Sequence, residues 1–362
     1  MRVLNVMLSR GLGGVQKAFA GYTTLLGHLG HEVVSCVAPG ALVRSYLPAY
    51  STITRLPNAF ERDPVAILRA AYILRKRKPD LIVVHGKRAL MLMSFARRLA
   101  GLNIPLVNVL HRHRLKHIAR ADLNICISEP LRNEAAAAGV DPAKLAYVPN
   151  FLTGELTAST NAVRRDPPVV GFLGRMVPEK GLDLLIDALR ILKESGVRVT
   201  ARIGGDGPER QALMGMASAR ALGPDLQWLG WVDSVSDFHN SIDVLCVPSR
   251  WESFGLVILE AYKAGVAVVS TRTTGPVSII KDKINGLLCD IDAKDLAAKL
   301  KVVIENPEFA QRMANQAAYD VMAYDIAAVA PAVEALLQNV VMRVSAARAP
   351  DLSSAASGVA NQ

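Results

Sequence analysis

The sequence predicts an α/β protein with two doubly wound parallel sheets, one in each of two domains that face each other across a cleft. Short β-branched runs alternate with longer stretches of helical apolar spacing, and parallel strands need helical crossovers of this kind. The alternation stops near residues 149–168, where Thr, Asn, Gly, Arg and Pro dominate, and then resumes, which indicates a linker. The 362 residues are enough for two cores, because a domain usually takes roughly 150.

The composition supports folding of most of the chain. Hydrophobic residues make up 51% and charged residues 20%, which excludes a disordered protein. We expect a first domain over residues 1–165, a second over 166–324, a last helix over 325–343 that packs back on the first domain, and a disordered tail over 344–362.

Each predicted element follows from its local pattern. The strands are apolar and β-branched, and we expect them at 2–8, 32–38, 81–85, 106–110 and 123–127, then at 169–173, 199–204, 227–229, 244–247, 267–270 and 286–289. The helices repeat apolar residues every three or four positions, and we expect them at 15–29, 64–77 and 89–100, then at 181–194, 209–221, 236–241, 255–264, 293–305 and 325–343. Ligands of such sheets bind at the carboxyl ends of the strands, so the site is expected in the strand-to-helix loops.

The net charge of +10 is unevenly distributed. Residues 1–165 carry 23 Lys and Arg against 9 Asp and Glu, whereas the remaining residues carry 19 against 23. Basic clusters at 75–78, 87–88, 97–98 and 112–120 suit nucleic acid, anionic lipid headgroups or a phosphorylated substrate, and a solvated surface is the alternative. Nucleic acid is disfavoured, because aromatic residues are 5% of the chain and the basic clusters contain almost none.

The sequence carries no strong targeting or redox signal. The apolar run at 3–8 is too short for a secretory signal, and the late apolar stretch 327–342 is interrupted by Pro331, Glu334, Gln338 and Asn339. We therefore expect a cytoplasmic protein that does not span a membrane. The four cysteines are widely spaced in apolar strand-like segments, so we expect buried thiols.

The most informative segment is Arg250-Trp251-Glu252-Ser253-Phe254-Gly255-Leu256-Val257-Ile258-Leu259-Glu260. It follows a predicted strand and begins a helix, so the free amides of Gly255, Leu256 and Val257 form an anion site. Eight residues of helix separate Glu252 from Glu260 by roughly 10 to 12 Å. One carboxylate could accept hydrogen bonds from a sugar and the other from a ribose at opposite ends of a diphosphate. A dipole-stabilised Glu and an unrelated helical Glu are the alternative.

Three further loops support this interpretation. The segment 171–181 brings Arg175 and Lys180 to the same edge, where two cations can neutralise a diphosphate without a metal. The turn Gly204-Gly205-Asp206-Gly207-Pro208 allows the backbone to approach a flat ring closely. In the first domain, Gly11-Leu12-Gly13-Gly14 opens a helix as a phosphate-binding loop would, although Gln16 replaces the last glycine of the dinucleotide-binding pattern.

Together these motifs resemble the family-4 retaining glycosyltransferases of the GT-B architecture, which have two Rossmann-like domains. The resemblance spans about 1–341 and rests on the E-x7-E segment, on Gly-Arg-x-x-x-x-Lys-Gly and on Gly-Gly-Asp-Gly-Pro. The segments 79–86 and 148–150 are also similar to family landmarks. The resemblance implies transfer of a sugar from a nucleotide diphosphate donor, with a uridine diphosphate sugar favoured, and without a metal or other cofactor.

The resemblance also implies residue roles. Arg175 and Lys180 would hold the diphosphate, Glu252 the transferred sugar, and Glu260 the ribose. The segment Phe254, Gly255, Leu256, Val257 would cradle phosphates and sugar, together with Gly13 and Gly14 across the cleft. The base would lie near Gly205 and Asp206, and His111, ranked above His85, would lie near the sugar.

One segment departs from the family pattern. The family commonly has Gly-Gly-x-Pro-Glu where this chain has Thr274-Gly275-Pro276-Val277-Ser278, so Ser278 replaces the usual Glu and leaves the sugar unassigned. The Asp290-Ile291-Asp292 segment matches a metal-binding D-x-D pattern, but Asp292 is better placed to cap the next helix.

We expect the anomeric configuration to be retained, since no carboxylate is marked as a covalent nucleophile. The basic first domain would face the acceptor, a glycan or lipid-linked saccharide of lipopolysaccharide or another envelope polysaccharide at an anionic inner-membrane surface. A nucleotide-sugar epimerase and a non-catalytic nucleotide-sugar binding protein are the alternatives.

Overall fold

The computed structural model describes residues 1–11, 13–113, 115–154 and 165–346. Residues 155–164 of the predicted linker and residues 347–362 of the predicted tail lie outside the described residues. Residues 344–346 of that tail are helical, because the last helix continues to Ala346.

The first domain contains a seven-stranded parallel sheet of order β3-β2-β1-β4-β5-β6-β7. Its strands are β1 (Arg2–Met7), β2 (Glu32–Val37), β3 (Thr52–Arg55), β4 (Leu81–His85), β5 (Leu106–Leu110), β6 (Leu123–Cys126) and β7 (Leu145–Tyr147). Its helices are α1 (Gly14–His28), α2 (Pro64–Arg77), α3 (Lys87–Leu99) and α4 (Glu129–Ala137). The strand order reverses between β1 and β4, which is the position where open α/β sheets bind ligands.

The second domain contains a six-stranded parallel sheet of order β10-β9-β8-β11-β12-β13. Its strands are β8 (Val169–Leu173), β9 (Thr200–Gly204), β10 (Leu226–Gly230), β11 (Val244–Val247), β12 (Ala267–Thr271) and β13 (Leu287–Cys289). The helices from here to the end are α5 (Leu182–Glu194), α6 (Arg210–Ala219), α7 (Val235–Asn240), α8 (Leu256–Lys263), α9 (Pro276–Ile279), α10 (Ala293–Glu305), α11 (Pro307–Asp320) and α12 (Ile326–Ala346). The predicted pair of doubly wound sheets is confirmed.

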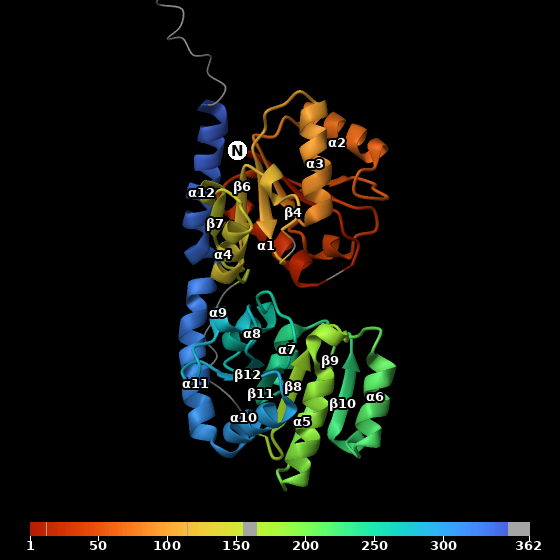
Figure 1. Ribbon diagram of the computed structural model, residues 1–362, viewed down its shortest axis with the longest axis vertical. Coiled ribbons are helices and arrows are strands. Elements are labelled where there is room, and N and C mark those ends of the chain that lie inside the picture. The colour runs from red at the N-terminus through yellow and green to blue at the C-terminus, as the bar shows by residue number, and fades with distance from the viewer. Residues whose placement is uncertain (12, 114, 155–164, 347–362) are drawn as a thin grey trace, which may run out of the picture.

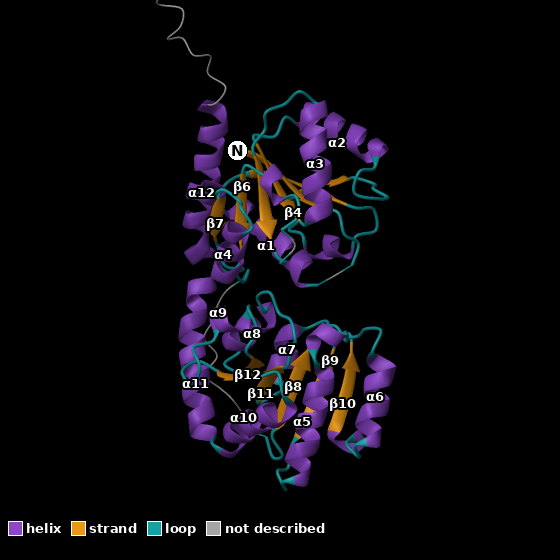
Figure 2. Ribbon diagram, in the orientation of Figure 1, coloured by secondary structure: helices purple, strands orange, loops and turns teal. Residues whose placement is uncertain are grey.

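The two sheets point their carboxyl ends toward each other, as the strand arrows in Figure 2 show. The chain passes between the domains twice. Leu152 lies on the first connection and Tyr324 on the second, and the amide of Leu152 donates to the carbonyl of Tyr324 at 2.9 Å. Leu152 and Asp325 also form an isolated parallel β-bridge. The two connections are therefore tied together beside the boundary between the domains.

Helix α12 lies along the flank of the first domain (Figure 1). Val333 and Leu337 are fully buried in the same core as the strands of that domain. Glu334 Oε2 lies 2.7 Å from His31 Nε2, and the Arg343 guanidinium donates to the carbonyl of Ala143. Among the described helices, α12 alone has the length and apolar composition of a membrane-crossing helix, and here its apolar face packs on protein.

The elements missing from the prediction are short or weakly patterned. Strand β3 is a mostly exposed edge strand of four residues, and β7 has three half-buried residues. Helices α4 and α11 bury mainly alanine, which gives a weak apolar signal. Tertiary contacts rather than local pattern define these elements.

All four cysteines are buried and unpaired, as predicted. Burial raises the pKa of Cys36 to about 12, so this thiol stays protonated and unreactive at neutral pH.

Candidate active site

Helix α8 begins at the carboxyl edge of the second sheet, directly after the loop that follows β11. Gly255 precedes its first residue with φ +102°, a conformation that side chains rarely adopt. No side chain caps this end. The first amides of a helix have no intrahelical acceptor, so the α8 N-terminus offers donors to an anion. Phe254, however, is buried against Tyr324, so only its backbone is available and a side-chain role in donor binding is excluded.

Lys180 and Glu252 lie in contact, because Lys180 Nζ donates to Glu252 Oε2. The loops that carry them are joined by backbone, since the amides of Arg250 and Trp251 donate to the carbonyl of Glu179 at 2.9 and 3.2 Å. An ammonium has three donors, so Lys180 can hold Glu252 and still donate to a phosphate.

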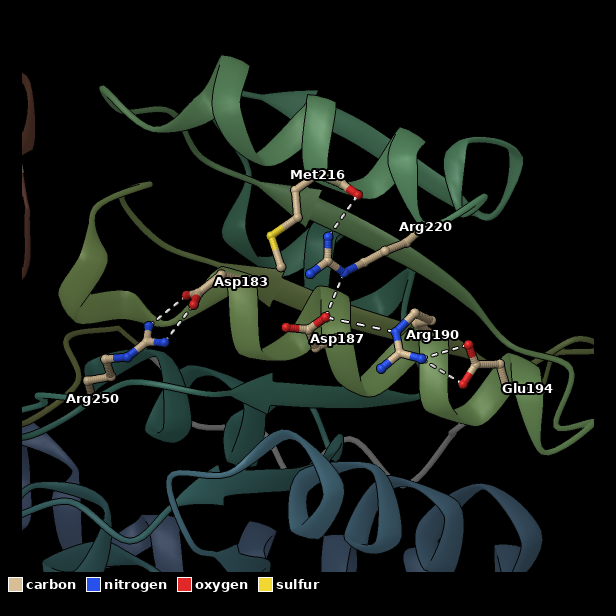
Figure 3. Close-up of polar contacts among 7 residues, drawn as sticks. All are labelled: Asp183, Asp187, Arg190, Glu194, Met216, Arg220 and Arg250. Carbon is tan, nitrogen blue, oxygen red and sulfur yellow. Dashed lines mark hydrogen bonds and ion pairs between the residues drawn. The ribbon is translucent and has the colours of Figure 1, made fainter.

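Arg250 fixes this loop to helix α5. Its guanidinium makes a two-pronged contact with Asp183 at 2.6 and 2.5 Å, drawn at the left of Figure 3. Partial burial opposes ionisation of Asp183, yet hydrogen bonding and the charge of Arg250 hold the pKa of Asp183 below its ordinary value. The pair therefore positions the segment that leads to Glu252. The prediction did not assign this role, although Arg250 belongs to the segment it singled out.

The second carboxylate, Glu260, contacts the other domain. Its Oε1 lies 2.9 Å from Nζ of Lys17, which is in the first turns of α1. Within the described part of the chain, Oε2 of Glu260 has no hydrogen-bond partner and remains able to accept from a hydroxyl. Nothing in the sequence identified Lys17, because its partner is 243 positions away and in the other domain.

The two glycine loops of the second domain pack against each other's backbone. A Cβ at Gly205 would lie 1.9 Å from the carbonyl oxygen of Gly174, and one at Gly207 would lie 2.3 Å from that of Met176. These glycines are therefore required by the packing of the two loops, and the expected close approach of a flat ring stays a prediction. The space that a side chain would need is filled by this chain's own backbone.

The remaining predicted residues lie at the loops expected for them. Arg175 is exposed, and its side chain makes no hydrogen bond or ion pair with a described residue, which leaves its charge available. Asp206 is exposed, and its carboxylate accepts from the amide of Gly207 at 2.7 Å. Gly13 and Gly14 are exposed at the start of α1, and a Cβ at Gly14 would meet nothing within 4 Å.

His111 belongs to a buried hydrogen-bonded chain in the first domain. His111 Nε2 lies 2.9 Å from His85 Nδ1, and His85 Nε2 lies 3.0 Å from Asn5 Oδ1. The Asn5 amide nitrogen donates to Thr23 and to the carbonyl of Phe19, so its oxygen must face His85. The prediction named both histidines and missed Asn5, which sits on β1 as an ordinary strand residue.

The hydrogen bonds from Asn5 through His85 set the tautomer of His111. Asn5 Oδ1 only accepts, so His85 donates from Nε2 and accepts at Nδ1. His111 then donates from Nε2 and keeps a lone pair on Nδ1. Burial, reinforced by the charge of Arg112, lowers the pKa of His111 to about 3, and burial lowers that of His85 well below its ordinary value. At neutral pH His111 is therefore a neutral acceptor.

Two further histidines, His113 and His239, lie near the boundary between the domains. The ring of His113 meets that of Trp251 edge-on, with centroids 5.6 Å apart, and His113 Nδ1 contacts Glu134. His239 on α7 is 1% exposed, and neither of its ring nitrogens has a hydrogen-bond partner among the described residues. Burial lowers the pKa of His239 to about 4, opposed by the charge of Glu260 and reinforced by that of Lys17.

Two further residues singled out in the sequence have local roles. Asp292 accepts from the amides of Lys294 and Asp295 at 2.9 and 3.0 Å, which confirms the predicted cap of α10. Ser278 Oγ donates to the carbonyl of Gly275, whose own amide donates to the carbonyl of Glu252. The loop that lacks the family's Glu therefore supports the loop of Glu252.

Comparison with known proteins identifies the class. The Glycosyltransferase Family 4 model matches residues 12–153, and the Glycosyl transferases group 1 model matches residues 157–320. The lipopolysaccharide core biosynthesis glycosyltransferase LpsE of Rhizobium meliloti is 28% identical over 314 residues, which are 84% of this chain and 89% of that protein. An Escherichia coli UDP-Gal:alpha-D-GlcNAc-diphosphoundecaprenol alpha-1,3-galactosyltransferase is 24% identical over 334 residues, with 82% and 85% covered.

The fold comparison agrees. The Anabaena HepE structure in complex with UDP-glucose superimposes with a TM-score of 0.82 at 21% identity, covering 94% of this chain and all of that one. Fold and sequence together define a glycosyltransferase of GT-B architecture. More specifically, its first domain matches the Glycosyltransferase Family 4 model and its second domain matches the Glycosyl transferases group 1 model.

The Asn5–His85–His111 chain predicts a defined response to Asn5→Asp. A carboxylate at this position raises the pKa of His85, and protonated His85 donates from both nitrogens, which reverses the proton on His111. We expect turnover to fall by at least about tenfold at neutral pH, the effect of roughly one hydrogen bond, and to recover partly at alkaline pH. The pH profile of kcat is the measurement.

The control is Thr23→Val, which removes a hydrogen bond to the Asn5 amide nitrogen but leaves its oxygen in place. It should change thermal stability and leave the shape of the pH profile as in the wild type. Identical profiles for Asn5→Asp and Thr23→Val would contradict the relay.

His239 predicts the pH dependence of stability. Its pKa is about 4 in the folded chain and near 6.5 when unfolded, so the unfolded state takes up the proton first as the pH falls. Stability present above pH 6.5 is therefore lost progressively toward pH 4. His239→Phe removes the titrating imidazole with its two unpartnered nitrogens. We therefore expect a higher melting temperature and a smaller loss of melting temperature as the pH falls.

Melting temperatures of wild type and His239→Phe between pH 4 and 8 test this expectation. His28→Phe, at an exposed position at the end of α1, is the matched control and should retain the wild-type slope. A wild-type slope in His239→Phe would show that His239 does not contribute to acid sensitivity.

Proposed function

We propose that the protein transfers a sugar from a nucleotide diphosphate donor, a uridine diphosphate sugar in our preferred assignment, to a hydroxyl of a glycan or lipid-linked acceptor. The observation that carries the proposal is the pair of carboxylates around the α8 N-terminus, each held by a lysine. Lys180 holds Glu252, and Lys17 holds Glu260. One anion site flanked by two hydrogen-bond acceptors fits a diphosphate with a sugar at one end and a ribose at the other.

The proposed roles follow from this arrangement. The α8 amides, Arg175 and Lys180 receive the charge that develops on the leaving diphosphate. Glu252 accepts from hydroxyls of the transferred sugar, and Oε2 of Glu260 accepts from the ribose. The neutral His111 accepts a further sugar hydroxyl at Nδ1. These groups bind and neutralise the donor without a metal ion.

In the proposed step, the bond between the anomeric carbon and the diphosphate oxygen breaks as the acceptor oxygen bonds to that carbon from the same face. The acceptor proton passes to the leaving diphosphate oxygen, and the anomeric configuration is retained. Four buried protonated thiols suit a reducing cytoplasm, where we place the reaction.

Two relatives support the choice of donor and acceptor. The Escherichia coli enzyme is named for a UDP-linked galactose and a diphosphoundecaprenol acceptor, and LpsE is named for lipopolysaccharide core biosynthesis. We therefore propose an acceptor in lipopolysaccharide or a related envelope polysaccharide.

Glu260→Gln and Lys180→Ala test the assignment. Removing a charged group that acts on the developing charge costs about 10²- to 10³-fold in kcat, so we expect at least that loss for Lys180→Ala and weaker nucleotide binding for Glu260→Gln. Glu308→Gln, on the exposed start of α11, is the matched control and should retain activity. Turnover is measured with a panel of nucleotide sugars, together with melting temperature to show that each variant folds.

The same assay separates the alternatives. Product that forms without an acceptor would indicate an epimerase, and nucleotide-sugar binding without turnover would indicate a binding protein. An inverted anomeric configuration by NMR would contradict retention, and loss of activity in EDTA that Mg²⁺ restores would contradict the metal-independent mechanism.

A further inference from the structure

Helix α2 presents three large apolar side chains to solvent. Val65, Leu68 and Tyr72 are 54%, 60% and 64% exposed, and their spacing of three and four residues places them on one face. The opposite side of the helix already packs on the core through Ala66, Ala70, Ala71 and Leu74, with Ile67 and Ile73 half-buried beside them. A surface helix needs only one apolar face for its own core, so the second, exposed one calls for an outside partner.

The end of α3 extends this face. The Arg75 guanidinium donates to the carbonyls of Leu99 and Ala100 at 3.4 and 3.2 Å, which ties the last turn of α2 to the end of α3. Leu99 is 50% exposed there. We call Val65, Leu68, Tyr72 and Leu99 the docking stripe. Figure 1 shows α2 and α3 on the flank of the first domain opposite α12.

Cations border the docking stripe on both sides. At 100° per residue, Arg75 lies on one side of Leu68 and Tyr72, and Arg69 and Lys76 lie on the other. Lys76 Nζ is 5.8 Å from the centroid of the Tyr72 ring. Residues 42–99 as a whole carry twelve Lys and Arg against three Asp and Glu. An apolar line between rows of cations is the pattern of a helix that lies in the headgroup region of an anionic membrane.

We propose that the docking stripe inserts into an anionic lipid leaflet, with Arg69 and Lys76 on the lipid phosphates. The charge argues against a second copy of this chain, which would bring two strongly basic faces together. The outer face of α12 is a poorer candidate, since its exposed positions are mainly Ala, Gln and Asn. This inference rests on the proposed function for its purpose, because a lipid-linked acceptor is held in the same leaflet.

The position of the stripe suits that purpose. Helix α2 follows the carboxyl end of β3, so it starts at the edge of the sheet that faces the second domain. The loop before α2 is tied to the start of α3 by Lys87 Nζ and Glu61 Oε2, 2.9 Å apart, and it exposes 56% of Phe60. The loop before α2 therefore connects the stripe to the edge of the sheet where the donor residues meet.

Cosedimentation with phosphatidylglycerol-containing vesicles and with pure phosphatidylcholine vesicles tests the proposal on the full chain. Leu68→Ser/Tyr72→Ser removes the apolar contact, and Tyr319→Ser/Met322→Ser is its control at exposed apolar positions of the second domain. Arg69→Glu/Lys76→Glu reverses the charge, and Arg69→Lys/Lys76→Arg is its charge-preserving control.

We expect the wild type and both controls to bind anionic vesicles, weakly in high salt, and to leave phosphatidylcholine vesicles unbound. Each stripe variant should lose at least about fivefold in vesicle affinity, since each loses an apolar or an electrostatic contribution to binding. Unchanged binding of folded stripe variants, equal binding to both vesicle types, or a wild type that does not bind would overturn the proposal.

Transfer to a soluble acceptor analogue is measured beside vesicle binding. Stripe variants should keep this activity, because the stripe lies outside the donor site. A chain that binds vesicles through the stripe yet shows no transfer refutes the proposed function alone, and a chain that transfers without binding refutes the docking stripe alone.

Discussion

The site depends on the neutralisation of two carboxylates that stand beside an anion-binding helix end. Left unpaired, each would repel a diphosphate by about 3 kcal/mol at 5 Å and an effective dielectric constant near 20. Lys180 and Lys17 remove this repulsion while leaving one oxygen of each carboxylate to accept a hydroxyl. Since one lysine belongs to each domain, the two domains must meet for both carboxylates to be balanced. The arrangement of the domains is thus a condition of the donor site.

In the first domain, burial and hydrogen bonding keep His111 neutral and oriented. Burial alone would lower the pKa of His111 but leave its tautomer open. The fixed amide of Asn5 decides it through His85, because each member of the chain has only one remaining way to pair. His239 has no such partners, and its two buried nitrogens are an energetic cost that sits next to Glu260. Burial therefore has two outcomes in this protein: His111 is an oriented neutral acceptor, whereas His239 makes stability sensitive to acid.

The sequence predicted most of the fold, because buried parallel strands and amphipathic helices leave strong local patterns. Strands such as Leu106–Leu110 and helices such as Pro64–Arg77 have the predicted bounds, whereas the edge strand Thr52–Arg55 has no apolar face to reveal it. Within the site, motif spacing pointed to Lys180 and Glu252, which the structure places in contact. It could not reveal Lys17 or Asn5, since their roles arise only when distant segments meet. The same holds for Gly205, which has to be glycine because the backbone of Gly174 occupies the place of a Cβ.

The uneven charge of the chain fits a division of work between the domains. In the proposed membrane contact, the basic first domain would be attracted to an anionic leaflet and the acidic second domain would not, so the leaflet would select one face of the molecule. Attraction by charge alone would leave the orientation loose, because it acts over about a Debye length of 8 to 10 Å. Apolar insertion of a single stripe fixes which face of the molecule meets the membrane and how the molecule is tilted. Helix α2 can provide such a stripe because it is apolar on two faces: Ile67, Ile73 and Leu74 pack on the core, whereas Val65, Leu68 and Tyr72 are exposed.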